Sequence, residues 1–329
     1  MQKHDFTSLN SNSDFTTLAL KTFCFQARNN AVYKKYLQLI NVTPNKINNI
    51  KNIPFLPITF FKTHKIKSFK TKEDIVFTSS GTTGNETSKH YVKDLEIYKK
   101  SFESAFKLFY GNISDYCILA LLPSYLERNG SSLIYMVNEL IKQSENNLSG
   151  FYINNFDELN NKLKILSKNK QKTILLGVSF ALMDFSEKYP QKLPNNFIVM
   201  ETGGMKGRRK EIIRSELHKT LCNNFGVKLI HSEYGMTELL SQAYSKGNGT
   251  YFCPPWMKII IRDIYDPFSY LPNGKTGGIN VIDLANQYSC SFIETQDLGK
   301  TYNDGSFEVI GRIENSQIRG CNLLISDYK

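Results

Sequence analysis

Residues 77–84 read "FTSSGTTG", and seven of these eight residues are Ser, Thr or Gly. The run "DIVFTS" at 74–79 predicts a strand that leads into this stretch, and a helical pattern follows near 93–109. Glycines let a backbone turn tightly and approach a ligand, while hydroxyls and exposed N–H groups together bind anions. Lys89 adds a positive charge close by. Because α/β folds place ligands where a strand is followed by a helix, the stretch predicts a phosphate-binding loop.

This loop lacks the signature of a P-loop nucleotidase. A Walker A loop needs GxxxxGK[ST], and neither Gly81 nor Gly84 is followed by such a Gly-Lys pair. The alternative to a phosphate-binding loop is a polar surface loop of Ser and Thr.

A second stretch of polar and aromatic residues, "HSEYGMTE" at 231–238, follows an apolar strand-like run. Tyr234 can stack on a base, Gly235 permits a turn, and Thr237 can bond a phosphate. Glu238 can bind a divalent cation, since magnesium on nucleotide phosphates needs only one or two protein carboxylates. The alternative is a helix N-terminus with Thr237 and Glu238 as ordinary first-turn residues.

Strand-like and helix-like runs alternate around these two stretches, which predicts a layered α/β fold. The strand-like runs are 74–79, 117–122, 173–178, 197–200 and 227–231. The helix-like runs are 93–109, 131–143, 156–168 and 208–224. Before them, 14–41 reads as helical, with Asp14 as a plausible N-cap, and 52–62, with two prolines, reads as an extended connection.

From about residue 245, Gly, Pro, Asn and Asp separate short β-type runs. These runs are 257–262, 278–283, 290–295 and 306–312. We therefore predict three parts: an N-terminal helical segment over 1–70, an α/β core over 71–244 and a β-rich subdomain over 245–329.

The composition is that of a globular protein, with 41% apolar and 22% charged residues in a chain of 329. The net charge is +11, but the lysines are dispersed and match no nucleic-acid-binding module. No two of the six cysteines are spaced as CxxC, so no zinc site is expected. The N-terminus lacks a signal-peptide apolar region, and "CILALL" at 117–122 is too short to span a bilayer. We expect a cytoplasmic protein with no membrane span and no nucleic-acid partner.

Taken together, five motifs in order resemble the adenylate-forming superfamily of acyl-CoA synthetases, luciferases and peptide-synthetase adenylation domains. The motifs are "FTSSGTTG…SK" (77–89), "ETGGMKGRR" (201–209), "EYGMTE" (233–238), "ETQDLG" (294–299) and "GRIENSQIRG" (311–320). The fold that this resemblance implies is the large N-terminal domain of that superfamily, layered α/β with a small β-rich subdomain.

The resemblance also implies ATP and Mg²⁺ as cofactors and assigns roles to residues. The phosphate loop is Thr78, Ser79, Ser80, Gly81, Thr82, Thr83, Gly84 and Lys89. The adenine and acyl pocket includes Gly203, Gly204, Glu233, Tyr234, Gly235 and Met236. Thr237 corresponds to the α-phosphate ligand, Glu238 to the metal ligand, and Asp297 and Arg312 to the ribose ligands.

Within the superfamily the sequence most resembles the LuxE-type acyl-protein synthetases, the long-chain fatty acid–luciferin-component ligases of bioluminescence. Like them, it is expected to lack the mobile C-terminal domain with its catalytic lysine. Lys206, Arg208 or Arg209 could supply that charge, or a partner protein could supply it. Cys321, in "RGCNLL", matches the family's acyl-accepting cysteine, and a thiolate is a good acyl carrier. The other interpretation of Cys321 is a small buried residue.

This resemblance implies that a carboxylic acid, most simply a fatty acid, is activated to acyl-AMP and passed to a thiol. The implied partners are the small-molecule acid and an acyl reductase or acyl-carrier protein. The apolar stretch "GVSFALMDF" (177–185) is expected to line the acyl pocket. Two alternatives stay open: a phenylacetate-type carboxylate–CoA ligase, and a catalytically degenerate nucleotide-binding subunit.

Overall fold

The computed structural model describes residues 5–9, 11–79, 87–123, 130–203 and 212–313. The chain divides into two compact units, residues 71–254 and residues 1–70 together with 255–329. The predicted division at 70 and 244 into three parts stays a prediction. Each unit is described by itself.

The unit of residues 71–254 contains a sheet whose strand order is β10-β9-β8-β7-β6-β4-β5. Five of its strands are parallel, and they are β4 (Cys117–Leu121), β5 (Gly150–Phe151), β6 (Thr173–Val178), β7 (Phe197–Thr202) and β8 (His231–Tyr234). Strands β9 (Ala243–Ser245) and β10 (Thr250–Phe252) extend it in antiparallel fashion. Every residue of β4 and β6 is buried, as is typical of parallel strands covered on both faces.

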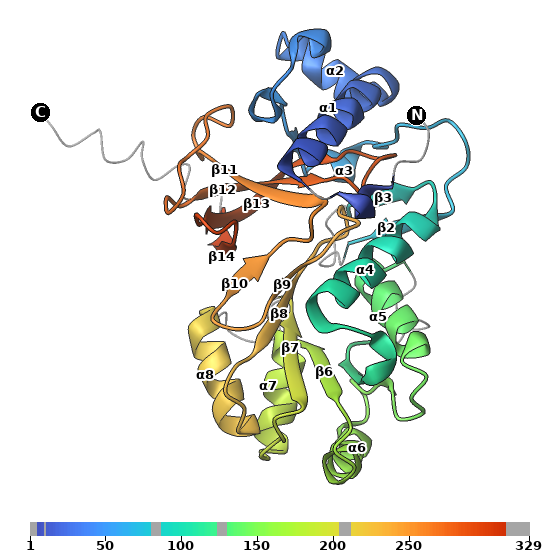
Figure 1. Ribbon diagram of the computed structural model, residues 1–329, viewed down its shortest axis with the longest axis vertical. Coiled ribbons are helices and arrows are strands. Elements are labelled where there is room, and N and C mark those ends of the chain that lie inside the picture. The colour runs from blue at the N-terminus through green and yellow to red at the C-terminus, as the bar shows by residue number, and fades with distance from the viewer. Residues whose placement is uncertain (1–4, 10, 80–86, 124–129, 204–211, 314–329) are drawn as a thin grey trace, which may run out of the picture. The chain divides into compact units, whose positions relative to one another are not determined.

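Five helices connect and cover these strands (Figure 1). They are α4 (Leu95–Tyr110), α5 (Ser132–Gln143), α6 (Phe156–Lys168), α7 (Ser179–Lys188) and α8 (Arg214–Phe225), with a 3₁₀ turn at Ile113–Asp115. Helices α4 and α5 pack together, and α7 packs beside α8 (Figure 1). The two antiparallel strands β2 (Ile75–Thr78) and β3 (Lys89–Val92) form a separate small sheet.

The other unit is built on the antiparallel order β11-β12-β13-β14. These strands are β11 (Met257–Arg262), β12 (Gly277–Asp283), β13 (Phe292–Thr301) and β14 (Phe307–Arg312). The N-terminal elements are α1 (Asn12–Asn29), α2 (Ala31–Leu39), β1 (Leu56–Pro57), α3 (Phe60–Thr63) and 3₁₀ turns at Phe6–Ser8, Pro44–Lys46 and Ile50–Asn52. Strand β1 pairs in parallel with β13.

A buried glutamine joins the N-terminal helices to this sheet. The Gln26 amide donates to the carbonyls of Asn286 and Gln287 at 2.9 and 3.0 Å, and its oxygen accepts from the Ser291 N–H at 2.9 Å. Because Gln26 is fully buried, losing these bonds would leave several polar groups without partners. The contact explains why residues far apart in the sequence belong to one unit.

The α/β prediction is confirmed, and the strands at 117, 173 and 257 and the helix at 156–168 begin where the sequence predicts. The predicted helical region 14–41 is two helices, because Asn30 ends α1 and its side chain caps α2. Two local predictions are wrong. Of the run 227–231 only His231 belongs to β8, and 52–62 contains β1 and α3 instead of an extended connection.

Candidate functional site

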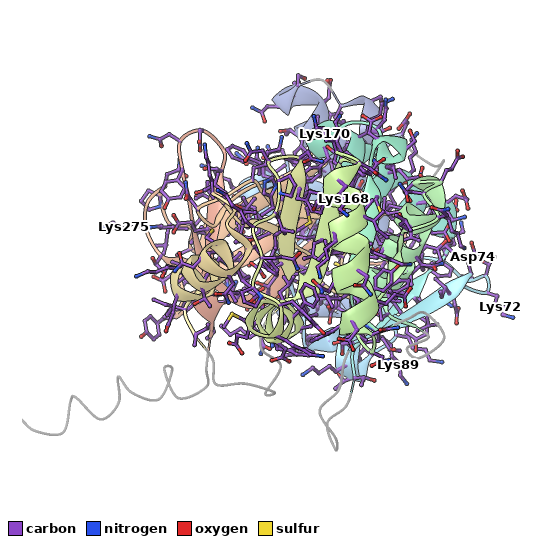
Figure 2. The ribbon with its side chains drawn as sticks, turned by 90° about the horizontal axis from the view of Figure 1, so that it is seen from below. Lys72, Asp74, Lys89, Lys168, Lys170 and Lys275 are labelled. Carbon is purple, nitrogen blue, oxygen red and sulfur yellow. The ribbon has the colours of Figure 1, made fainter. Side chains whose placement is uncertain are left out.

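The predicted phosphate loop lies between two antiparallel strands, so the expectation that a helix directly follows it is wrong. Thr78 is paired in register with Lys89, at the ends of β2 and β3. The Ser79 N–H donates to the Ser88 carbonyl at 3.1 Å, and the Ser88 N–H donates to Ser79 Oγ at 2.9 Å. These bonds close the base of the hairpin, and Lys89 is exposed at the surface (Figure 2).

Gly130 supports the same hairpin from another segment. Its carbonyl accepts from the Thr78 N–H at 2.7 Å, and its φ of +89° lies in the region that favours glycine. A Cβ at this position would lie 3.1 Å from Thr78 Oγ1. The backbone of Thr78 is therefore positioned by a conformation that other residues adopt only with strain.

The second predicted stretch begins with β8 and continues into a non-helical return toward β9, so the alternative of a helix N-terminus is wrong. Met236 and Thr237 are half-buried, while Tyr234 and Glu238 are buried. The Tyr234 ring packs edge-on against Tyr251, with centroids 6.0 Å apart. The accessible part of the stretch is its turn from Gly235 to Thr237.

A buried histidine connects the two predicted stretches. His90 on β3 is fully buried, and its Nδ1 lies 2.8 Å from the Thr237 carbonyl. Because a carbonyl oxygen only accepts, Nδ1 carries the hydrogen. The hairpin that carries Thr78 and Lys89 is thus held directly to the turn that carries Thr237. Among the described residues, this contact links the two segments that carry Thr78, Ser79 and Lys89 on one side and Thr237 on the other.

Glu233 is a buried carboxyl at the end of β8. Burial raises its pKa to about 7; a hydrogen bond from Thr202 Oγ1, 2.5 Å from Glu233 Oε2, opposes the shift, and nearby Glu201 adds to it. A Cβ at position 235 would lie 2.5 Å from Glu233 Oε1, so Gly235 makes room for this carboxyl. The arrangement places beside the turn a carboxyl group, that of Glu233, with a pKa of about 7.

The neighbouring strand β7 ends in the predicted Gly-rich segment. Glu201 is buried, and its Oε1 lies 3.5 Å from Arg214 Nε and 3.5 Å from His218 Nε2. Gly203 has a φ of +68°, and its carbonyl accepts from Ser179 Oγ at 2.8 Å. The strand end is thus fixed by Ser179 of α7 and by Arg214 and His218 of α8.

A pocket of about 350 Å³ opens beside the start of α7. Phe180, Ala181 and Asp184 of the stretch predicted to line the acyl pocket are among its walls, together with Pro123, Ile153, Asn154 and Phe156. It lies where β4, β5 and β6 end, the edge at which parallel sheets bind ligands. The sequence did not predict α7 itself.

His231, at the start of β8, shows no feature of a general base. It is half-buried, and Tyr110 Oη lies 3.3 Å from its Nδ1. Burial and, to a lesser extent, Lys246 lower its pKa to about 4. The ring is therefore a weak base that is neutral near pH 7.

In the other unit, Asp297 and Arg312 face each other across β13 and β14. They are register partners, and Asp297 Oδ1 lies 3.6 Å from Arg312 Nε. The Asp297 side chain is 14% exposed, whereas that of Arg312 is 85% exposed. The structure therefore brings together the two residues predicted to bind ribose. Beside them lies buried Arg262, which the sequence analysis missed because arginine is usually at the surface.

Several predicted residues lie outside the described residues. They are Ser80, Gly81, Thr82, Thr83, Gly84, Gly204, Lys206, Arg208, Arg209 and Cys321. Among the residues that are described, no group of three or more His, Cys, Asp or Glu side chains could hold a metal ion. Within the same part of the chain, no helix is both long and apolar enough to cross a membrane.

Comparison with known proteins identifies relatives. The family model described as "Acyl-protein synthetase, LuxE" matches residues 8–328. ATP-bound MatB from Rhodopseudomonas palustris is similar in structure, with a TM-score of 0.54 and 18% identity over 74% of this chain and 49% of that one. This chain thus spans about half the length of MatB. No curated protein sequence matches it significantly.

A second similar structure is 2-hydroxyisobutyryl-CoA ligase in complex with 2-HIB-AMP and CoA. Its TM-score is 0.67 and its identity 12%, over 99% of this chain and 79% of that one. An open conformation of the same ligase has a TM-score of 0.66 and 11% identity, over 95% and 81% of the two chains. At such low identity these similarities show the fold, which is that of adenylate-forming ligases, as predicted.

Proposed function

The chain belongs to the LuxE acyl-protein synthetase family of acyl-adenylate-forming ligases, and we propose that it activates a carboxylic acid with ATP and transfers the acyl group to a cysteine thiol. A carboxylate oxygen attacks the α-phosphorus of ATP, and pyrophosphate leaves. A thiolate then attacks the acyl carbonyl of acyl-AMP, and AMP leaves. The family match over residues 8–328 is the observation that carries this proposal.

The phosphate end of ATP is assigned to the hairpin and the turn that His90 connects. Thr78, Ser79 and Lys89, with the loop residues 80–84, would hold the β- and γ-phosphates, and Thr237 the α-phosphate. Attack on phosphorus is catalysed mainly by positioning and by charge stabilisation. Supporting this role, the Thr237 backbone is held to β3 by a 2.8 Å hydrogen bond.

The nucleoside is assigned to the remaining predicted residues. Gly203, Gly204, Glu233, Tyr234, Gly235 and Met236 would line the adenine and acyl side. Asp297 and Arg312 would hold the ribose hydroxyls. Their 3.6 Å separation supports this, because a carboxylate and a guanidinium together offer an acceptor and donors to a vicinal diol.

Magnesium would bind through Glu238. This buried carboxylate follows Thr237 directly, and magnesium on nucleotide phosphates needs only one or two protein carboxylates. When bound, the ion would neutralise phosphate charge. Glu238 is thus compatible with the metal, although the described residues contain no larger cluster of ligands.

The acid is proposed to be a fatty acid and to enter the pocket at the start of α7. Phe180 and Ala181 supply apolar walls, but Asp184 and Asn154 also line the pocket. A chain with a polar substituent would therefore also fit. The partner would be an acyl reductase or an acyl-carrier protein.

The test is acid-dependent exchange of pyrophosphate into ATP across a panel of fatty, aromatic and hydroxy acids, followed by intact-mass analysis. An acyl adduct that is present in the wild type and absent in Cys321→Ser would support transfer to the protein's own thiol. Exchange without an adduct would move the acceptor to a partner protein, or to CoA if CoA then releases AMP. Nucleotide binding without exchange for any acid would contradict the enzymatic proposal and favour a degenerate nucleotide-binding subunit.

A further inference from the structure

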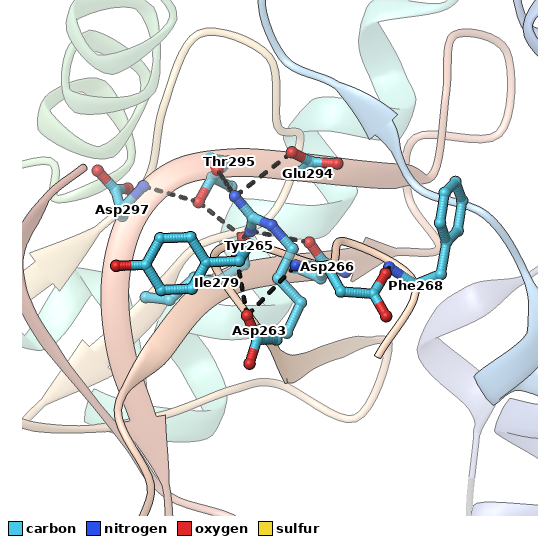
Figure 3. A network of polar contacts seen from close by, with 10 residues as sticks. Asp263, Tyr265, Asp266, Phe268, Ile279, Glu294, Thr295 and Asp297 are labelled. Atoms are coloured by element: carbon cyan, nitrogen blue, oxygen red, sulfur yellow. Dashed lines mark hydrogen bonds and ion pairs between the residues drawn. The ribbon is translucent and has the colours of Figure 1, made fainter. Parts of the chain in front are cut away.

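Arg262, the last residue of β11, is buried at 4% exposure. Its Nη1 donates to the Ile279 carbonyl and to Asn280 Oδ1, each at 3.0 Å. Its Nη2 donates to the Thr295 carbonyl at 2.7 Å (Figure 3). One guanidinium therefore spans β12 and reaches β13. A buried arginine usually has such a fork of partners, because leaving its donors unpaired is costly.

The path of this side chain depends on a glycine. A Cβ at position 278 would lie 2.4 Å from the Arg262 Cζ and 2.5 Å from its Nη1. No side chain at 278 could be accommodated without displacing the guanidinium. Gly278 on β12 is therefore required for Arg262 to reach β13.

The guanidinium reaches β13 at a bulge. Gly278 is paired with Leu298, and Asn280 with Glu294, so one residue of β12 stands opposite the three residues 295–297 of β13. Extra residues of this kind bend a strand and redirect its side chains. Asp297, the proposed ribose ligand, is the last residue of the bulge.

Strand β13 also changes its partner at this bulge. Before it, the Glu294 carbonyl accepts from the Ile58 N–H at 2.9 Å, beside β1. After it, the Gln296 carbonyl accepts from the Ile313 N–H at 2.8 Å, beyond β14. The Thr295 carbonyl between them is satisfied by Arg262. Arg262 thus holds the first residue of the bulge through its backbone carbonyl.

The Thr295 hydroxyl completes the same arrangement. It donates to the Ile279 carbonyl at 2.8 Å and accepts from the Asp297 N–H at 3.1 Å (Figure 3). The Ile279 carbonyl consequently receives hydrogen bonds from both Arg262 and Thr295. A continuous path of hydrogen bonds leads from Arg262 to the backbone of Asp297.

Arg262 also interacts electrostatically with carboxylates of β13. Arg262 Nη2 lies 3.5 Å from Glu294 Oε1, and the Asp297 carboxylate also interacts electrostatically with the guanidinium. Asp297 therefore has a buried cation on one side and exposed Arg312 on the other. Both place positive charge next to the Asp297 side chain, whose oxygens can accept hydrogen bonds from hydroxyls.

We propose that Arg262 is a positioning residue that fixes the 295–297 bulge and so aims the Asp297 carboxylate at a vicinal diol of the ligand. The inference rests on the proposed function, in which that diol belongs to the ribose of ATP. Ribose selectivity then depends on a buried residue, Arg262, that does not itself contact the nucleotide.

The experiment compares ATP with 2′,3′-dideoxy-ATP in acid-dependent pyrophosphate exchange. The readout is the ratio of the two kcat/KM values in the full chain. We expect Arg262→Met and Arg262→Lys to lower the preference for ATP about tenfold, the effect of losing roughly one charge-assisted hydrogen bond. Asp297→Asn should lower the preference by a similar factor, and combining it with Arg262→Met should add little.

Lys258→Met is the matched control. Lys258 lies on the same strand and contacts Asn12 and Phe15 instead of the bulge, so its loss should leave the preference for ATP unchanged. If Arg262→Met fails to fold, Thr295→Val removes the bulge hydroxyl without removing a buried charge and should lower the preference as well. A wild-type preference for ATP that persists in folded Arg262→Lys and Thr295→Val would overturn the inference. Absence of exchange in the wild type would instead contradict the proposed function.

Discussion

At the scale of single residues, His90 and Glu233 account for the form of the proposed phosphate site. Glu233 belongs to a motif that the sequence analysis singled out, and His90 directly follows another, but their contacts were not predictable. His90 bonds Thr237, which is 147 positions away in sequence. Such a contact depends on how the helices and strands pack, whereas local sequence patterns carry information only about residues that are close together in the sequence.

We expect His90→Ala to slow pyrophosphate exchange about tenfold or more, because small displacements of positioning groups have effects of this size. It should also destabilise the fold by about 1–3 kcal/mol, since the half-buried Thr237 carbonyl loses the donor that the buried His90 ring supplies. Asn has an N–H donor near the place of Nδ1, so His90→Asn should restore much of the activity, whereas His90→Leu should not. Steady-state kinetics and denaturant unfolding measure both effects. Equal activities of the Asn and Leu variants would show that the hydrogen bond is irrelevant.

Glu233 predicts a pH dependence of stability. Its pKa in the folded protein is raised from 4.5 to about 7, so the folded state keeps the proton that the unfolded state releases. Stability should therefore fall as pH rises from about 4.5 to 7, by about 3 kcal/mol at most. His231, whose pKa is lowered to about 4, contributes the opposite trend below its ordinary value of 6.5.

The measurement is the difference in unfolding free energy between the wild type and Glu233→Gln across this pH range. The His231 contribution cancels in that difference. The variant should gain stability relative to the wild type as pH rises, because its side chain does not ionise. A difference that is flat from pH 4.5 to 7 would rule out the raised pKa.

At the scale of elements, the buried strands of the large sheet could be predicted from the sequence better than the elements between them. Strands such as β4 and β6 were recognisable because strands buried on both faces read as continuous apolar runs. Strand β3, "KHYV", was missed because four residues with an exposed lysine give no clear alternation. Helix α7 was missed because most of its residues are buried and it has little polar face to create a periodic pattern.

The β2–β3 hairpin yields a prediction with a matched control. Gly130→Ala and Gly111→Ala both place alanine at a positive φ, +89° and +88° respectively. Each should cost roughly 1–3 kcal/mol of stability from backbone strain. Only Gly130 contacts Thr78, whereas a Cβ at Gly111 meets nothing within 4 Å.

Gly130→Ala alone should therefore raise the KM for ATP, by several-fold, while Gly111→Ala should leave it unchanged. Thermal unfolding and the ATP dependence of exchange are measured on both variants. A similar KM in the two would mean that the position of Thr78 does not affect nucleotide binding.

At the scale of the whole molecule, the family could be predicted because its motifs are short, ordered and rich in distinctive residues. The match over residues 8–328 confirms it. What could not be predicted is which residues outside the motifs position the residues inside them. Arg262 and Gly278 lie outside every motif, and their relation to Asp297 follows from a bulge that has no local sequence signal.

The central claim, that the chain forms acyl-adenylates, is tested most directly by acid-dependent exchange of labelled pyrophosphate into ATP. We expect exchange by the wild type to require a carboxylic acid. In the double variant Thr237→Ala, Asp297→Ala, exchange should fall at least about a hundredfold, because two positioning contacts are lost. Folded wild-type protein that binds ATP but supports no exchange with any acid of the panel would contradict the claim.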